Sequence, residues 1–259
     1  MHGREFEIDK ITILRPSFYQ SARNWFGLPE KALSSRSGGV KAALIVAIGT
    51  ICCYFAVNEL ATIRGVTVFD PTQLFVLGDR TIDSRIPYLP WTVMIYKWYG
   101  VYFLLPVLFY PKTVAGVREL FRLYTGMISL ALICYALFLL FPVEMTLRVD
   151  VIPEGSSPFF HEMNRVIHSV DRPFNTWPSM HVALPGLATM VMGAWLKGRF
   201  GKALIYGFWI AMSISTLTTK QHVLWDVLTG GLLAGIYWRC LLRKSLSEVE
   251  GKPDRIITG

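Results

Sequence analysis

The sequence predicts an all-α integral membrane protein built as a bundle of six transmembrane helices. Six apolar runs are separated by polar segments, and the first three come close to the length that a bilayer requires. Of the 259 residues, 53% are hydrophobic and only 17% are charged, whereas soluble domains average about 25% charged residues. Basic residues also concentrate in alternate polar segments, as expected of a chain that crosses a membrane repeatedly.

The six spans fall into three longer and three shorter runs. They are expected at about Val40–Ile63, Trp91–Tyr110, Leu123–Phe141, His181–Leu196, Ala203–Leu217 and Trp225–Leu242. The first three come close to the roughly 20 residues that cross a bilayer. The last three are shorter, as expected of helices whose outer ends open onto a polar site.

The domain organisation follows from these runs. Residues 39–242 are expected to form one membrane domain, and residues 243–259 a cytoplasmic tail. Residues 1–38 are basic with scattered apolar side chains, which fits either an amphipathic helix at the interface or a disordered, lipid-attracted tail. We expect no secretory signal peptide, because no apolar core follows the charged start.

The charge of the connecting segments predicts the orientation. Segment 111–122 holds three basic residues and one acidic residue, and segment 197–202 holds three basic residues and no acidic one. Segment 143–180 has five acidic residues against three basic ones. The positive-inside rule therefore places the first two segments and both termini in the cytoplasm, and segment 143–180 outside.

The net charge of +8 would suggest nucleic-acid binding in a soluble protein. Here the excess basic residues flank apolar runs, so we expect no nucleic-acid partner. The four cysteines show no spacing typical of metal ligands.

Polar side chains precede the fourth span, where Pro178 and Ser179 come just before His181. Ser179 can cap the helix, whose N-terminus would attract an anion. His181 would then be placed to give a proton to a leaving oxygen. An ordinary cap and turn without a catalytic role is the alternative.

His222 and Asp226 lie four residues apart at the start of the sixth span. On a helix they share one face, so Asp226 can accept a hydrogen bond from one ring nitrogen and leave the other free to attack. A helix-capping histidine, with Asp226 interacting with the helix dipole, is the alternative.

Two arginines in segment 143–180 could bind a phosphate. Arg165 and Arg172 are seven residues apart, two turns along one face of a helix. Guanidinium groups there could hold phosphate oxygens, or they could form salt bridges with Glu162 and Asp171 in a solvated loop. His161, in the same segment, is expected at the surface.

These residues together resemble the type 2 phosphatidic acid phosphatase superfamily. The resemblance rests on Pro178-Ser179-Met180-His181, on His222-x-x-x-Asp226 and on Arg172-Pro173 upstream. Segments 175–181 and 215–222 are similar to its inositolphosphotransferase-like branch, which includes the fungal inositol phosphorylceramide synthases. The resemblance covers about residues 160–240.

The resemblance implies a role for each motif residue. His222 would be the nucleophile that becomes a phosphohistidine, oriented by Asp226, and His181 would protonate the leaving group. The phosphoryl oxygens would be held by Ser179, Arg172 and Arg165. Neither a metal nor another cofactor is implied.

Two departures from the family pattern stand out. Arg165 replaces the lysine of the first motif, and Ser215-Thr216 stands where the third motif has Ser-Arg. Lys220 is the candidate to replace that missing positive charge. The missing arginine favours the transferase-like branch.

The expected function is that of a membrane lipid phosphatase acting on a lipid phosphate or pyrophosphate through a phosphohistidine. The first alternative is a lipid phosphotransferase that moves a phosphoryl headgroup to an alcohol acceptor. A non-catalytic transporter or scaffold is the alternative of another class. The expected partners are the lipid substrate and membrane lipids, and the expected location is a bacterial inner membrane with the site facing the periplasm.

Overall fold

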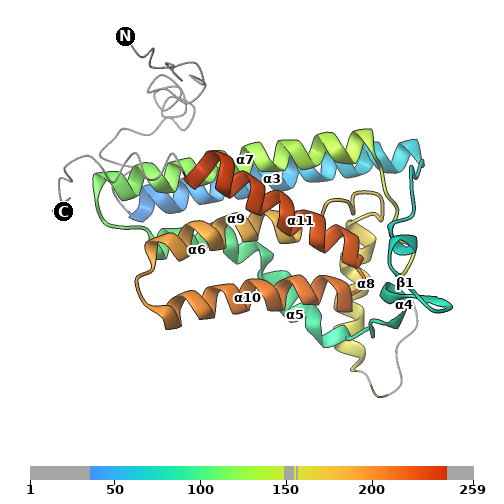
Figure 1. Ribbon diagram of the computed structural model, residues 1–259. Coiled ribbons are helices and arrows are strands. Elements are labelled where there is room, and N and C mark those ends of the chain that lie inside the picture. The colour runs from blue at the N-terminus through green and yellow to red at the C-terminus, as the bar shows by residue number, and fades with distance from the viewer. Residues whose placement is uncertain (1–35, 149–154, 156, 244–259) are drawn as a thin grey trace, which may run out of the picture.

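The computed structural model describes residues 36–148, 155 and 157–243. Long helices lie side by side in a bundle, and one shorter helix, α8 (Pro158–Val170), crosses one end of it (Figure 1). The expectations for the N-terminal segment, the C-terminal tail and the side of the termini fall almost wholly outside the described residues.

Helices occupy all six of the expected places. The single helices are α3 (Arg36–Arg64), α7 (Val114–Leu140), α9 (Met180–Trp195), α10 (Arg199–Thr218) and α11 (Leu224–Tyr237), the last continued by a π-helical turn at Trp238–Leu242. The second place holds a composite run of two 3-10 turns (Pro90–Thr92 and Lys97–Gly100), α5 (Val93–Tyr96) and α6 (Val101–Phe109).

Four helical runs in the described part of the chain are long and apolar enough to cross a membrane. They are Ser37–Arg64, Pro90–Phe109, Ala115–Leu140 and Arg199–Thr218. Helix α9 is apolar but has only 16 residues. An all-α membrane protein is therefore supported, whereas the count of six crossings stays a prediction.

The third helix begins at Val114, earlier than the predicted Leu123. The prediction placed the start of the span where the apolar run begins. The helix itself extends further toward the N-terminus, because charged residues interrupt an apolar run without interrupting a helix. The side chain of Thr113 caps the helix by accepting a hydrogen bond from the Gly116 N–H at 3.0 Å. Glu119, in the added turns, is buried and accepts a hydrogen bond from the indole of Trp195.

Helix α9 is the centre of the bundle and contacts α6, α7, α10 and α11. Its residues are apolar on all sides, and most of them are buried, which is the pattern of a helix enclosed by other helices. Gly186 lets α10 approach closely, because a Cβ there would lie 2.9 Å from the ring of Trp209. The helix that carries His181 is thus held by packing along its length.

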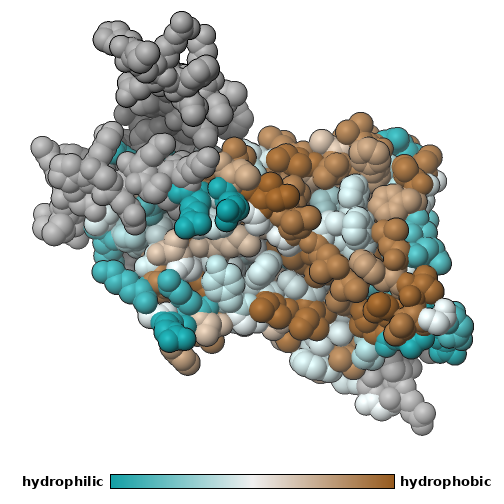
Figure 2. Space-filling model, in the orientation of Figure 1, coloured by the Kyte–Doolittle hydropathy of each residue, from teal (hydrophilic) through white to brown (hydrophobic). Residues whose placement is uncertain are grey.

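The outer surface of the bundle is largely apolar. Large hydrophobic side chains such as Ile48, Leu108, Leu132 and Leu232 are more than half exposed. Figure 2 shows apolar residues across the middle and right of one face, with hydrophilic residues gathered toward the two ends. An apolar belt across the helices is the surface that a bilayer requires.

Small elements gather at the end of the bundle that α8 crosses, which we call the site end (Figure 1). A hairpin of β1 (Val76–Leu77) and β2 (Arg80–Thr81) leads into α4 (Ile82–Arg85). Gly78 takes a positive φ of 69° in the hairpin turn, a conformation that glycine adopts at little cost. The basic connections before α7 and α10 lie at the opposite end.

Candidate active site

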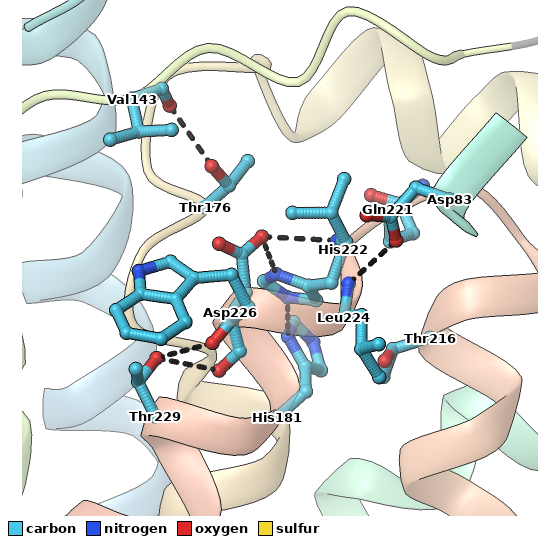
Figure 3. Close-up of polar contacts among 12 residues, drawn as sticks. Asp83, Val143, Thr176, His181, Thr216, Gln221, His222, Leu224, Asp226 and Thr229 are labelled. Carbon is cyan, nitrogen blue, oxygen red and sulfur yellow. Dashed lines mark hydrogen bonds and ion pairs between the residues drawn. The ribbon is translucent and has the colours of Figure 1, made fainter. Parts of the chain in front are cut away.

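Two histidines from segments far apart in the sequence face one another at the site end (Figure 3). His222 lies in the turn between α10 and α11, and His181 lies in the first turn of α9. The Nε2 atom of His222 is 3.4 Å from Nδ1 of His181, and Nδ1 of His222 is 3.4 Å from Oδ2 of Asp226. The structure therefore joins the three residues that the sequence singled out for catalysis.

The buried carboxylate of Asp226 fixes the chemistry of His222. Asp226 is completely buried, and His222 is only 6% exposed. A carboxylate facing Nδ1 favours the tautomer that carries its proton there, which leaves a lone pair on Nε2. Oδ2 of Asp226 also accepts a hydrogen bond from the Val223 N–H at 3.1 Å. Asp226 thus caps α11 and orients the histidine at once.

The backbone ties the two histidine segments together. The Ser179 N–H donates to the Asp226 carbonyl at 3.1 Å. A Cβ at Gly230 would lie only 2.6 Å from the Ser179 carbonyl oxygen. Only glycine fits such a close approach of α11 to the start of α9, so Gly230 helps to set the distance between the histidines.

Ser179 occupies the N-cap position of α9, as predicted, but its side chain makes no capping hydrogen bond. The residue is completely buried, and its Oγ has no hydrogen-bond partner in the part of the chain that the structure describes. A buried hydroxyl without a partner is costly. At a helix N-terminus it is well suited to an anion such as a phosphoryl group.

Aromatic rings enclose the other side of His181. The ring of Tyr96 stacks on it at a centroid distance of 4.6 Å, and the ring of Tyr99 lies at 4.5 Å in a tilted arrangement. Both tyrosines come from the composite second run. His181 thus lies between a polar partner, His222, and an aromatic wall.

The segment before α9 is fixed to the chain that follows α7. The Thr176 hydroxyl donates to the Val143 carbonyl at 3.1 Å (Figure 3), and the Met145 N–H donates to the Pro173 carbonyl at 2.8 Å. The Trp177–Pro178 peptide bond is cis. These contacts position the turn that presents Ser179.

The side chains of Arg165 and Arg172 contact acidic residues instead of entering the histidine site. Arg165 is exposed on α8 and donates to both carboxylate oxygens of Glu162, at 2.7 and 2.8 Å. Arg172 is also exposed, and its Nε lies 3.8 Å from Glu59. Asn58 of α3 instead holds the Arg172 backbone through hydrogen bonds of 2.9 and 3.2 Å.

Lys220 holds an outer loop in place. It has a positive φ of 56°, and its Nζ donates to the carbonyls of Asp83 and Ile86 at 3.0 and 2.6 Å. Burial lowers the pKa of Lys220, and the neighbouring Asp83 opposes this shift. Its ammonium group is thus engaged with the backbone near α4.

Asp83, which the sequence analysis did not select, supports the turn that carries His222. Its Oδ1 accepts a hydrogen bond from the Leu224 N–H at 2.7 Å (Figure 3), and the residue is only 2% exposed. Burial raises the pKa of Asp83, while the Leu224 N–H and Lys220 lower it. Its acidic character in an outer loop was the only signal in the sequence.

Arg148 is a second residue that the sequence analysis missed. Its Nη1 donates to the Asp171 carbonyl at 2.7 Å, and its Nη2 donates to Oε1 of Gln221 at 3.4 Å. A guanidinium group therefore lies beside the residue that precedes His222. Burial raises the pKa of the Asp171 carboxyl, whereas a hydrogen bond from Tyr54 and the nearby charges of Arg148 and His222 lower it.

The expectation that His161 lies at the surface was wrong. It is only 6% exposed, and its Nδ1 lies 3.3 Å from the Tyr88 hydroxyl. Because α8 crosses the end of the bundle, one of its faces is covered, and His161 lies on that face.

A comparison with protein families agrees with this geometry. The family model described as the PAP2 superfamily matches residues 80–240, more than half of the chain. The chain belongs to the PAP2 superfamily. Searches of curated proteins and of solved structures gave no match.

Membership supports a phosphatase or phosphotransferase that acts on a phosphate-containing substrate at a membrane. The match also begins well before residue 160, where the expected resemblance started. It therefore includes α4 and the composite run that provides Tyr96 and Tyr99. The inositolphosphotransferase-like branch stays a prediction.

Proposed function

We propose that this PAP2 protein is an integral membrane phosphatase that cleaves a lipid phosphate or pyrophosphate through a phosphohistidine at His222. The observation that carries the proposal is the arrangement of three side chains. Nδ1 of His222 faces the buried Asp226, and its Nε2 faces His181. This arrangement provides an oriented nucleophile with a proton donor beside it.

The first step forms a bond between phosphorus and Nε2 of His222. The bond from phosphorus to the leaving oxygen breaks, its electron pair stays on that oxygen, and His181 supplies the proton. Water then attacks the phosphohistidine, with His181 taking its proton, and phosphate is released. Asp226 stabilises the positive charge that develops on the His222 ring.

The phosphoryl oxygens need hydrogen-bond donors, and Ser179 is the best placed. Its buried hydroxyl has no partner within the described ranges, and it lies at the start of α9. We add Arg148, whose guanidinium donates to the Asp171 carbonyl and to Gln221 and so brings positive charge beside the turn that carries His222. The predicted ligands Arg172 and Arg165 would have to leave Glu59 and Glu162 to take part.

A lipid phosphotransferase is the second candidate, in which an alcohol replaces water in the second step. It is favoured by the absence of the motif arginine, since the ammonium group of Lys220, the predicted replacement, donates to backbone carbonyls. At the arginine position, the Thr216 hydroxyl donates to the Ser213 carbonyl of its own helix. The phosphate site is therefore less positive than a Ser-Arg motif would make it.

Turnover by the purified protein in detergent tests the proposal. A panel of labelled lipid phosphates and pyrophosphates is supplied with and without an added alcohol, beside His222→Ala. Free phosphate that is lost in the variant supports the phosphatase. Label that moves to the alcohol with little free phosphate supports the transferase, and no turnover across the panel supports a non-catalytic transporter or scaffold.

The location of the site completes the proposal. We place it on the periplasmic side of a bacterial inner membrane, because the basic connections lie at the opposite end of the bundle from the histidines. The substrate phosphate would then be presented from the outer leaflet.

A further inference from the structure

An apolar cavity of about 340 Å³ adjoins His181. Its lining includes His181, Tyr96 and Tyr99, and also Tyr54 and Asp171. The cavity therefore begins at the side chain that would protonate the leaving oxygen. The group bound to that oxygen must continue into the space beside His181, and this cavity is such a space.

The mouth of the cavity lies between two helices that expose apolar side chains. Ile51 and Phe55 of α3 are each 40% exposed, and Val166 and Val170 of α8 are 52% and 56% exposed. Since α3 is long and apolar enough to cross a membrane, its exposed apolar face is expected to contact hydrocarbon.

Helix α8 has the character of a helix that lies in the membrane interface. It crosses the ends of the long helices instead of running beside them (Figure 1). Val166 and Val170 are one turn apart on the face that lines the mouth, and Arg165 and Glu162 form an exposed ion pair beside it. Apolar and charged groups on neighbouring faces are typical of interfacial helices.

We propose that this cavity binds one hydrocarbon chain of the substrate's leaving alcohol, which enters sideways from the membrane between α3 and α8. The inference rests on the proposed function and extends it to the part of the substrate beyond the phosphate. A volume of about 340 Å³ is at the small end of the range of about 300–1,000 Å³ for ligand pockets. It suits the oxygen-proximal part of a single chain, with the remainder in the bilayer.

The cleavage step leaves the alcohol in this cavity. When the phosphorus–oxygen bond breaks, the electron pair and the His181 proton go to the leaving oxygen, and the neutral alcohol remains against Tyr96 and Tyr99. An apolar exit between α3 and α8 returns that alcohol to the membrane, while phosphate leaves from the polar side of the histidine pair.

Substrate selectivity tests the proposal. We would measure kcat/KM for a phosphate monoester of a sixteen-carbon alcohol and for the soluble p-nitrophenyl phosphate, in mixed micelles. Ile51→Trp and Val170→Trp are expected to lower the ratio of kcat/KM for the alkyl phosphate to kcat/KM for p-nitrophenyl phosphate at least tenfold. Leu60→Trp, on another face of α3 and 52% exposed in the wild type, should keep the ratio. An unchanged ratio in the first two variants overturns the proposal.

A labelling experiment keeps this proposal separate from the proposed function. An alkyl phosphate with a diazirine on its chain is photolysed with the His222→Ala protein, which needs no turnover. Label on residues 50–55 and 166–170 is expected. Label spread over α10 and α11 instead would refute the cavity, whatever the turnover assay shows. If the wild-type protein shows no turnover and the cavity of the variant is still labelled, only the proposed reaction is rejected.

Discussion

The backbone N–H of Leu224 donates to Oδ1 of Asp83 at 2.7 Å, although the two residues are 141 positions apart. On the other side of His222, Lys220 donates to the carbonyls of Asp83 and Ile86. The short helix α4 and the residue after it, Ile86, therefore hold both flanks of the turn that carries His222. An outer loop far from the catalytic motifs thus takes part in positioning His222.

Replacement of Asp83 should disturb this turn. Asp83→Ala removes the acceptor of the Leu224 N–H, and a buried donor without a partner costs about 1–3 kcal/mol. We expect a lower melting temperature and a kcat reduced at least tenfold, with Asp83→Asn retaining more activity because it keeps an acceptor oxygen. Asp79→Ala, whose side chain is 85% exposed, is the control. Wild-type turnover by Asp83→Ala would show that the contact is dispensable.

Lys220 separates a positioning role from a phosphate-binding role. Because its Nζ is engaged with two backbone carbonyls, Lys220→Met should lower kcat and thermal stability and leave KM within about threefold of the wild type. A residue that binds the substrate phosphate would instead raise KM strongly. Steady-state kinetics and thermal unfolding in detergent distinguish the two, with the exposed Lys197→Met as the control.

Gly230 should tolerate no side chain. In Gly230→Ala the new Cβ would overlap the Ser179 carbonyl oxygen, and forced overpacking typically costs about 1–3 kcal/mol. The start of α9 would shift relative to α11, so kcat should fall even when the variant remains folded. Gly235 lies on the same helix, and a Cβ there would meet nothing within 4 Å. Gly235→Ala should therefore be neutral or slightly stabilising. Equal behaviour of the two variants would contradict the close approach.

The sequence was informative wherever contacts are local or follow from an apolar run. The spacing of His222 and Asp226 predicted their pairing, and the six apolar runs predicted the six helical places. Asp83 and Arg148 could not be predicted, because they reach the site through contacts over 141 and 73 positions. Arg172 shows a second reason why contacts could not be predicted. A motif locates a residue in the chain but does not determine the direction of its side chain.

Arg148 should be more important for activity than either predicted arginine. Its guanidinium joins the Asp171 carbonyl to Gln221, so Arg148→Met should reduce kcat/KM at least a hundredfold. Arg165→Met should change it less than twofold, because Arg165 forms an exposed ion pair with Glu162, and such pairs contribute only about 0–1 kcal/mol. Parallel assays on one lipid phosphate decide the order. A larger loss of kcat/KM in Arg165→Met would instead support the predicted role of Arg165 as a phosphate ligand.

The orientation of the bundle can be tested by chemical labelling in intact cells. The hairpin that holds Asp79 lies at the site end, and the start of α10 lies at the opposite end (Figure 1). In a variant without Cys52, Cys53, Cys134 and Cys240, a single cysteine replaces either Asp79 or Arg199. A maleimide that cannot cross the inner membrane should label Asp79→Cys, because the positive-inside rule places the basic end in the cytoplasm. Arg199→Cys should be labelled only after the membrane is opened, and the reverse pattern would place the histidine pair in the cytoplasm.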